Sequence, residues 1–145
     1  SLAEAVALGA LIGPAQVTAR LIEMASGGRH HPIWTLAAAA GLSAVGLTML
    51  ALGLPLVGAA IFLYAAGNGI FSIARGALPL ALFGADRYAP VMGRLARPSL
   101  IAQAIAPTVG AALLTAAGTD LTLKVLALLA AANISLVLFL WRGID

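Results

Sequence analysis

The chain has few charged residues and no cysteine. Of its 145 residues, 9% are charged and 62% are hydrophobic, whereas soluble domains carry roughly 25% charged residues. The absence of cysteine excludes disulfides and thiolate chemistry. The net charge of +3 comes from short basic clusters between apolar runs, with no basic stripe, so nucleic acid is not an expected partner. The composition predicts a protein whose surroundings are a lipid bilayer.

Five apolar segments are long enough to cross the hydrocarbon core of a bilayer, which takes about 20 residues. They cover about residues 4–25, 32–53, 55–84, 98–117 and 121–141. The stretches between them carry the Gly, Pro and Asp residues typical of turns: SGGRHHP (26–32), GLP (53–55), GADRYAPVMGRLARP (84–98) and AAGTD (116–120). Pro32, Pro55 and Pro98 are expected in the first turns of the helices that follow. The sequence predicts an all-α, polytopic membrane helix bundle with five transmembrane helices, of which the third is the longest.

Basic residues predict the orientation of these helices. Six arginines fall on one side of a five-span serpentine, and the other side carries only Lys124; the six are Arg20, Arg29, Arg87, Arg94, Arg97 and Arg142. Because cytoplasmic loops carry the excess of Lys and Arg, we expect a multi-pass membrane protein whose 26–31 and 85–97 loops and C-terminus are cytoplasmic. Five spans would then leave the N-terminus outside, so we expect an upstream helix and a longer protein.

Arg75 is the only charged residue between Pro32 and Gly84. A charge near the bilayer centre costs about 2.5–3.5 kcal/mol on insertion scales, so such a side chain normally faces protein or a water-filled cavity. At helical spacing Arg75 shares a stripe with Tyr64, Asn68 and Phe71, which predicts a cavity-lining face. A neighbouring stripe of small residues, suited to close helix contact, consists of Ala65, Gly69, Ser72 and Gly76. The alternative is that Arg75 snorkels or forms an internal ion pair and has no substrate role.

Prolines and glutamines inside the spans provide further candidates. Pro79 cannot donate a hydrogen bond to the carbonyl of Arg75, which predicts a hinge at Gly76–Pro79. Pro14 and Pro107 lie inside spans in the same way and are also candidate hinges. Gln16 and Gln103 could line a solute path, although polar residues in spans more commonly form hydrogen bonds between helices.

Motifs for metal binding and catalysis are not apparent. His30 and His31 are adjacent, with no Cys or carboxylate at ligand spacing, so we expect no metal site there. The sequence contains no recognisable Ser/His/Asp set, paired-carboxylate site or phosphate-binding Gly loop. We therefore expect neither an enzyme nor a bound cofactor.

Three stretches resemble one transporter family. GALIGPAQVTARLIEMASGGRHHP (9–32), with the span after it, resembles the connection between helices eight and nine of the major facilitator superfamily. GNGIFSIARGALPLALFG (67–84) and RYAPVMGRLARPSLIAQAIAPTVGAALL (87–114) resemble helices ten and eleven of bacterial members. Gly13 matches the glycine of the superfamily's cytoplasmic Gly-x-x-x-Asp-Arg motif, but Val17 and Thr18 stand where its Asp and Arg would be. The resemblance covers essentially the whole chain, as helices eight to twelve of a C-terminal six-helix half.

This resemblance implies a secondary active transporter that works by alternating access, with its substrate bound between two six-helix halves. In that architecture helix ten lines the central cavity, helices eight and eleven border the other half, and helices nine and twelve face lipid. The implied function is ion-gradient-driven efflux of a small molecule that the sequence does not identify, and the implied partners are the missing N-terminal helices and the bilayer. The alternative is a non-transporting membrane scaffold or assembly subunit, for which stacked helices with small-residue faces suffice.

Overall fold

The computed structural model describes residues 1–26 and 28–143 and is built from α-helices. These are α1 (Leu2–Ala10), α2 (Ile12–Ala25), α3 (Pro32–Ala51) and α4 (Val57–Arg142). No strand occurs in the described residues, which confirms the all-helical prediction for that part of the chain. Three helical stretches, Leu2–Ala25, Pro32–Ala51 and Val57–Arg142, are long and apolar enough to cross a membrane.

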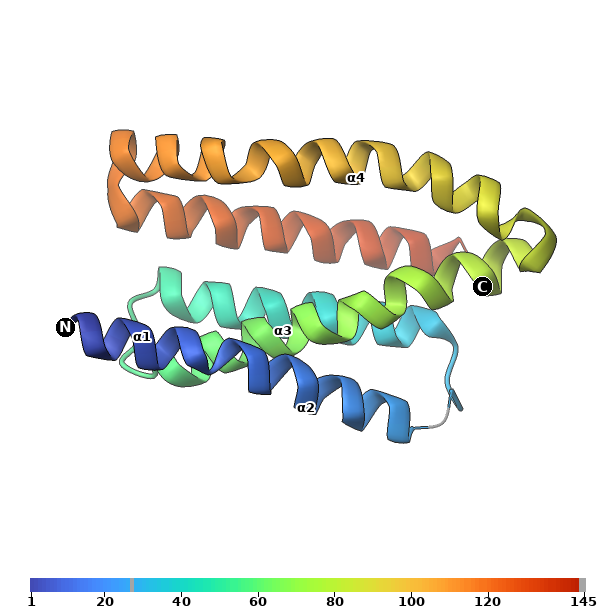
Figure 1. Ribbon diagram of the computed structural model, residues 1–145, viewed down its shortest axis with the longest axis horizontal. Coiled ribbons are helices and arrows are strands. Elements are labelled where there is room, and N and C mark those ends of the chain that lie inside the picture. The colour runs from blue at the N-terminus through green and yellow to red at the C-terminus, as the bar shows by residue number, and fades with distance from the viewer. Residues whose placement is uncertain (27, 144–145) are drawn as a thin grey trace.

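Two glycines divide α4 into three limbs. Gly84 has φ 72° and ψ 171°, and Gly118 has φ 76° and ψ 175°. Only glycine adopts such dihedrals without strain, so each position ends one helical run and starts another. The first limb comprises residues 57–83, the second 85–117 and the third 119–142, and Figure 1 shows them running back and forth.

The segment 85–97 corrects one sequence-based expectation, because it was predicted as a loop and is helical. Its charges and prolines suggested a turn, but Gly84 alone reverses the chain. Pro90 and Pro98 lie inside the helix, where each removes one backbone hydrogen bond. The second limb is consequently longer than the first, so the expectation that the third span would be the longest is wrong.

Helix starts and breaks nearer the N-terminus also have local causes. The predicted first span is interrupted at Leu11, because Pro14 has no N–H to donate to the carbonyl of Ala10. Helix α3 begins at Pro32 as expected, and the Nδ1 atom of His31 caps it by accepting a hydrogen bond from the Ile33 N–H at 3.2 Å. Pro55 was predicted to start a helix, and this prediction is wrong. It lies in the loop before α4, which begins at Val57.

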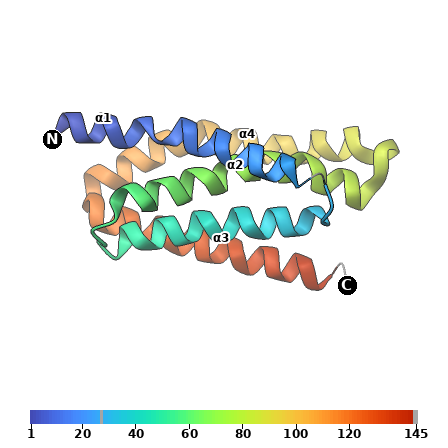
Figure 2. The same cartoon turned by 90° about the horizontal axis from the view of Figure 1, so that it is seen from below.

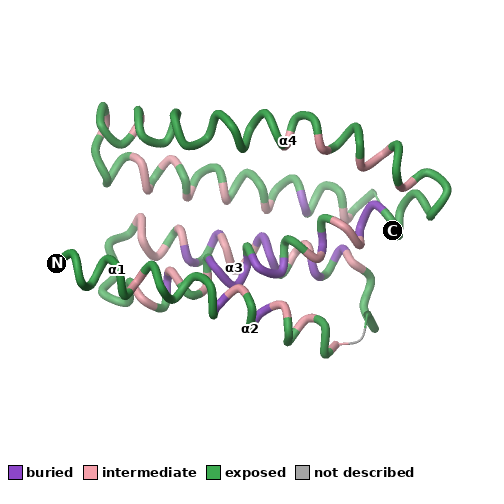
Figure 3. Tube along the Cα trace, in the orientation of Figure 1, coloured by how far each residue is buried: buried purple, intermediate pink, exposed green. Residues whose placement is uncertain are grey.

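Close contact between small residues holds the core together. Ala39 of α3 is buried in one cluster with Ala66 and Ile70 of the first limb, and Ala40, Ala44 and Ala60 are also buried. Three glycines permit the approach: Gly46 and Gly67 between α3 and the first limb, and Gly69 between that limb and α2. Figure 3 shows the buried residues concentrated on these helices. The predicted small-residue stripe therefore includes one true contact glycine, Gly69, and misses Gly46 and Gly67.

The second and third limbs lie outside this core. No residue of 85–117 is buried, and Val137 is the only buried residue of 119–142. The third limb is tied to α3 by Trp34 and Trp141, whose rings meet edge to face with centroids 4.0 Å apart and planes at 73°. Figure 2 shows the third limb beside α3, with the second limb on the other side of the bundle.

The connections alternate between two ends of the bundle. The link from α2 to α3, the turn at Gly84 and the end of the third limb lie at one end, and the α3–α4 loop and Gly118 lie at the other (Figure 1). The arginine-rich stretches therefore share one end, as a serpentine requires. The predicted cytoplasmic loop includes Gly27, and the predicted cytoplasmic C-terminus comprises Ile144 and Asp145; these three residues lie outside the described ones. Which end faces the cytoplasm stays a prediction.

Candidate functional site

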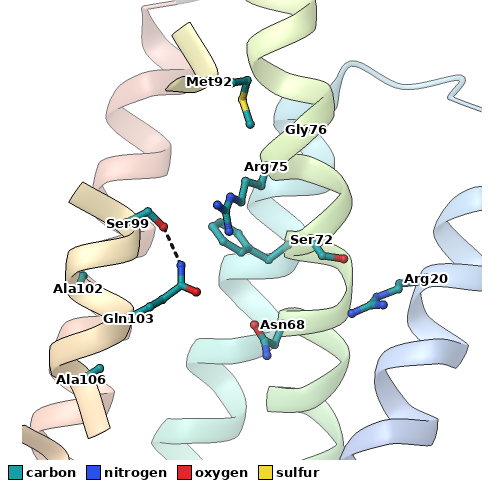
Figure 4. Close-up of a pocket in the computed structure, with 11 residues that line it drawn as sticks. Arg20, Asn68, Ser72, Arg75, Gly76, Met92, Ser99, Ala102, Gln103 and Ala106 are labelled. Atoms are coloured by element: carbon teal, nitrogen blue, oxygen red, sulfur yellow. Dashed lines mark hydrogen bonds between the residues drawn. The ribbon is translucent and has the colours of Figure 1, made fainter. Parts of the chain in front are cut away.

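A cleft of about 780 Å³ opens between α2, the first limb and the second limb. In Figure 4 the first limb lies in the middle, with α2 on one side and the second limb on the other. Its polar lining consists of Arg20, Asn68, Ser72, Arg75, Ser99 and Gln103. Of the predicted cavity residues, the structure brings Arg75, Asn68, Phe71 and Gln103 to this cleft. Whether they contact a substrate stays a prediction.

Arg75 projects from the first limb toward the second (Figure 4). Its side chain is exposed and forms no ion pair with any described residue. Backbone dihedrals stay helical at Gly76, Pro79 and Pro107, and they depart from helical values only at Gly84 and Gly118 within α4. The proposed hinge role of these prolines and of Pro14 stays a prediction.

Arg20 is a lining residue that sequence analysis missed. It was counted only as a topological charge, but its Nε donates a hydrogen bond to the Gly69 carbonyl at 3.3 Å, across to the first limb. Ser72 Oγ donates to the same carbonyl at 2.7 Å. A Cβ atom on Gly69 would lie 2.7 Å from the Gln16 carbonyl oxygen, so the glycine is what lets α2 approach closely enough for this bond. Nothing local in the sequence indicates that contact, since Arg20 and Gly69 are 49 residues apart.

The wall opposite α2 comes from the second limb. Gln103 Nε2 donates to Ser99 Oγ at 2.9 Å, one turn earlier in the same limb. This bond is within one helix, unlike the interhelical bond that sequence analysis considered more common. Pro107 has no N–H for the carbonyl of Gln103, just as Pro79 has none for the carbonyl of Arg75. On each limb, the residue with the polar side chain therefore also has a backbone carbonyl that lacks its usual helical hydrogen bond.

Two predicted residues lie away from the cleft. Tyr64 lines a separate cavity of about 310 Å³ between α3, the first limb and the third limb. Asn68 and Phe71 border both cavities, so the predicted stripe is divided between the two faces of the first limb. Gln16 is half-buried beside Gly69 and does not line the cleft, which favours a packing role.

Acidic groups of the described chain lie elsewhere. Glu23 accepts a hydrogen bond from Thr35 Oγ1 at 2.5 Å, which joins α2 to α3. Asp120 pairs with Lys124 at 2.7 Å beside the Gly118 turn. Among residues 1–26 and 28–143, the cleft is lined by two guanidinium groups and no carboxylate. Its local charge is therefore positive.

The arrangement can bind a solute, because guanidinium, amide and hydroxyl groups offer several hydrogen-bond donors within one cleft. No family model matches the chain, and neither the curated proteins nor the solved structures contain a similar one. Function must therefore be inferred from the residues of the site and the arrangement of its helices.

Proposed function

We propose that the chain forms part of the C-terminal half of a secondary transporter of the major facilitator type, in an inner membrane, with this cleft as part of its solute pathway. One observation carries the proposal: two arginines and four uncharged polar side chains, from three helical segments, line one cleft of a largely apolar bundle. Charged residues in membrane helices are costly and typically mark solute or ion pathways. A scaffold held together by small-residue contacts has no need for such a cleft.

The positions of the helices support the same proposal. Residues 2–25, the first limb and the second limb border the cleft, and they correspond to helices eight, ten and eleven in the resemblance. Helix α3 and the third limb correspond to helices nine and twelve; in Figure 4 α3 lies behind the first limb and the third limb lies behind the second. In a transporter of this type the open side of the cleft would face the other six-helix half, and alternating access would close it from either side in turn.

Solute uptake tests the proposal. Membrane vesicles containing the intact protein are given a proton or sodium gradient and four labelled probes: a monocarboxylate, a phosphate ester, a quaternary ammonium compound and a neutral sugar. We expect gradient-dependent movement of at least one probe. Arg75→Ala should abolish it without reducing membrane yield, since loss of a charge makes the span easier to insert.

Arg94→Ala is the matched control, because Arg94 is exposed on the second limb and does not line the cleft. It should leave uptake unchanged. Normal uptake by Arg75→Ala would contradict the proposed pathway. Loss of both uptake and folded protein in that variant would favour an internal ion pair, and movement of none of the probes would favour the scaffold.

A further inference from the structure

The cleft concentrates positive charge that no described residue neutralises. Arg20 reaches it from α2 and Arg75 from the first limb. The acidic residues Glu4, Glu23, Asp86 and Asp120 are all absent from its lining. Positive charge on membrane helices is costly unless water or an anion meets it, so a cleft with two guanidinium groups favours the entry of an anion.

We propose that this cleft binds an organic anion, with its carboxylate or phosphate group held by Arg75 and with Arg20 adding positive charge from the α2 side. The proposal rests on the transport function above and names the class of its substrate. Arg75 has no ion-pair partner among residues 1–26 and 28–143, so its planar set of five donors is available for bidentate contact with such a group. Arg20 uses Nε on the Gly69 carbonyl, which fixes the side chain.

The size of the cleft is compatible with an organic anion. A volume of about 780 Å³ is within the range of sites for organic molecules and far exceeds what an inorganic ion fills. Asn68 and Ser99 are placed to bind the remainder of the ligand.

Charged thiol reagents test the charge of the cleft without knowledge of the substrate. Because the chain has no cysteine, a single one can be placed at Ala102 or Ala106, which line the cleft. In the intact protein, with any other cysteine replaced, the rates of modification by anionic sulfonatoethyl and cationic trimethylammonioethyl methanethiosulfonate are compared. The control is Thr119→Cys, which is exposed beside the electrically balanced Asp120–Lys124 pair.

We expect the anionic-to-cationic rate ratio at Ala102→Cys to exceed that at Thr119→Cys by at least about tenfold. Arg75→Gln and Arg20→Gln should each reduce this excess, whereas Arg75→Lys, which keeps the charge, should retain most of it. Equal ratios at the two sites, a cationic preference, or no modification at either Ala102→Cys or Ala106→Cys would overturn the proposal. A carboxylate supplied by another helix would give equal ratios.

The outcome is separable from the test of transport. Gradient-driven uptake without an anionic preference would refute the substrate class and leave the transport function intact. An anionic preference without uptake of any probe would support an anion-binding cleft and count against the transport function.

Discussion

Gly67→Ala tests whether the core depends on the close backbone approach between α3 and the first limb. A Cβ atom at this position would lie 2.6 Å from the Ala39 carbonyl oxygen and 2.7 Å from the Ser43 nitrogen. Cβ atoms essentially never approach heavy atoms closer than 3.0 Å, so α3 must retreat by at least the difference of 0.4 Å. Both atoms belong to the backbone of a helix, so no side-chain rotation relieves the clash. The retreat would loosen the buried cluster that Ala39 forms with Ala66 and Ile70 of the first limb.

Overpacking of this kind costs about 1–3 kcal/mol, and for a domain of this size each kcal/mol lowers the melting temperature by about 2–4 °C. We expect Gly67→Ala to melt several degrees below the parent, measured as the fraction that stays monodisperse in detergent after heating. Gly93→Ala is the control, since Gly93 lies in the second limb with no atom near its missing Cβ. It should be neutral or stabilising, because Ala is favoured over Gly in helices by up to about 1 kcal/mol. Equal melting temperatures for the two variants would refute the proposed packing.

Two further predictions follow from the turns and the charge distribution. Gly118→Ala should lower the melting temperature in the same assay, because φ of 76° strains any residue with a Cβ; a melting temperature equal to that of the parent would contradict this. Cysteine at Gly28 or Ala89 should react with an impermeant reagent only from the cytoplasmic face, and cysteine at Thr119 only from the opposite face. Reaction of both groups from the same face would contradict the serpentine.

The hydropathy of the chain was sufficient to predict its helical stretches. A run such as 32–51 contains too few polar residues to be stable in water and carries a proline at its start, so both its helical state and its N-terminus could be predicted. Residues 85–97 were predicted wrongly for a related reason. Charged residues and prolines signal the end of an apolar run, but they do not distinguish a loop from the first turns of the next helix.

The site was predictable only where its residues stand out locally. Arg75 and Gln103 are polar residues inside apolar runs, so the sequence alone singled them out, and the structure brings both to one cleft. Arg20 lies near a loop rich in basic residues, and its contact with Gly69 depends on how α2 packs against the first limb. Tyr64 shares a helical stripe with Arg75 but lies in the other cavity, because spacing along one helix does not say how many neighbours it has.

The central claim is that the cleft is a pathway that opens to both faces of the membrane in turn. The most direct measurement is the reaction of Ala102→Cys with an impermeant thiol reagent in right-side-out and in inverted vesicles. Ala102 lines the cleft, whereas Ala104, two residues on and on the opposite side of the same helix, does not, so Ala104→Cys is the control. We predict that Ala102→Cys reacts from both faces and Ala104→Cys from neither. Reaction of Ala102→Cys from one face only, or from neither, would contradict the claim.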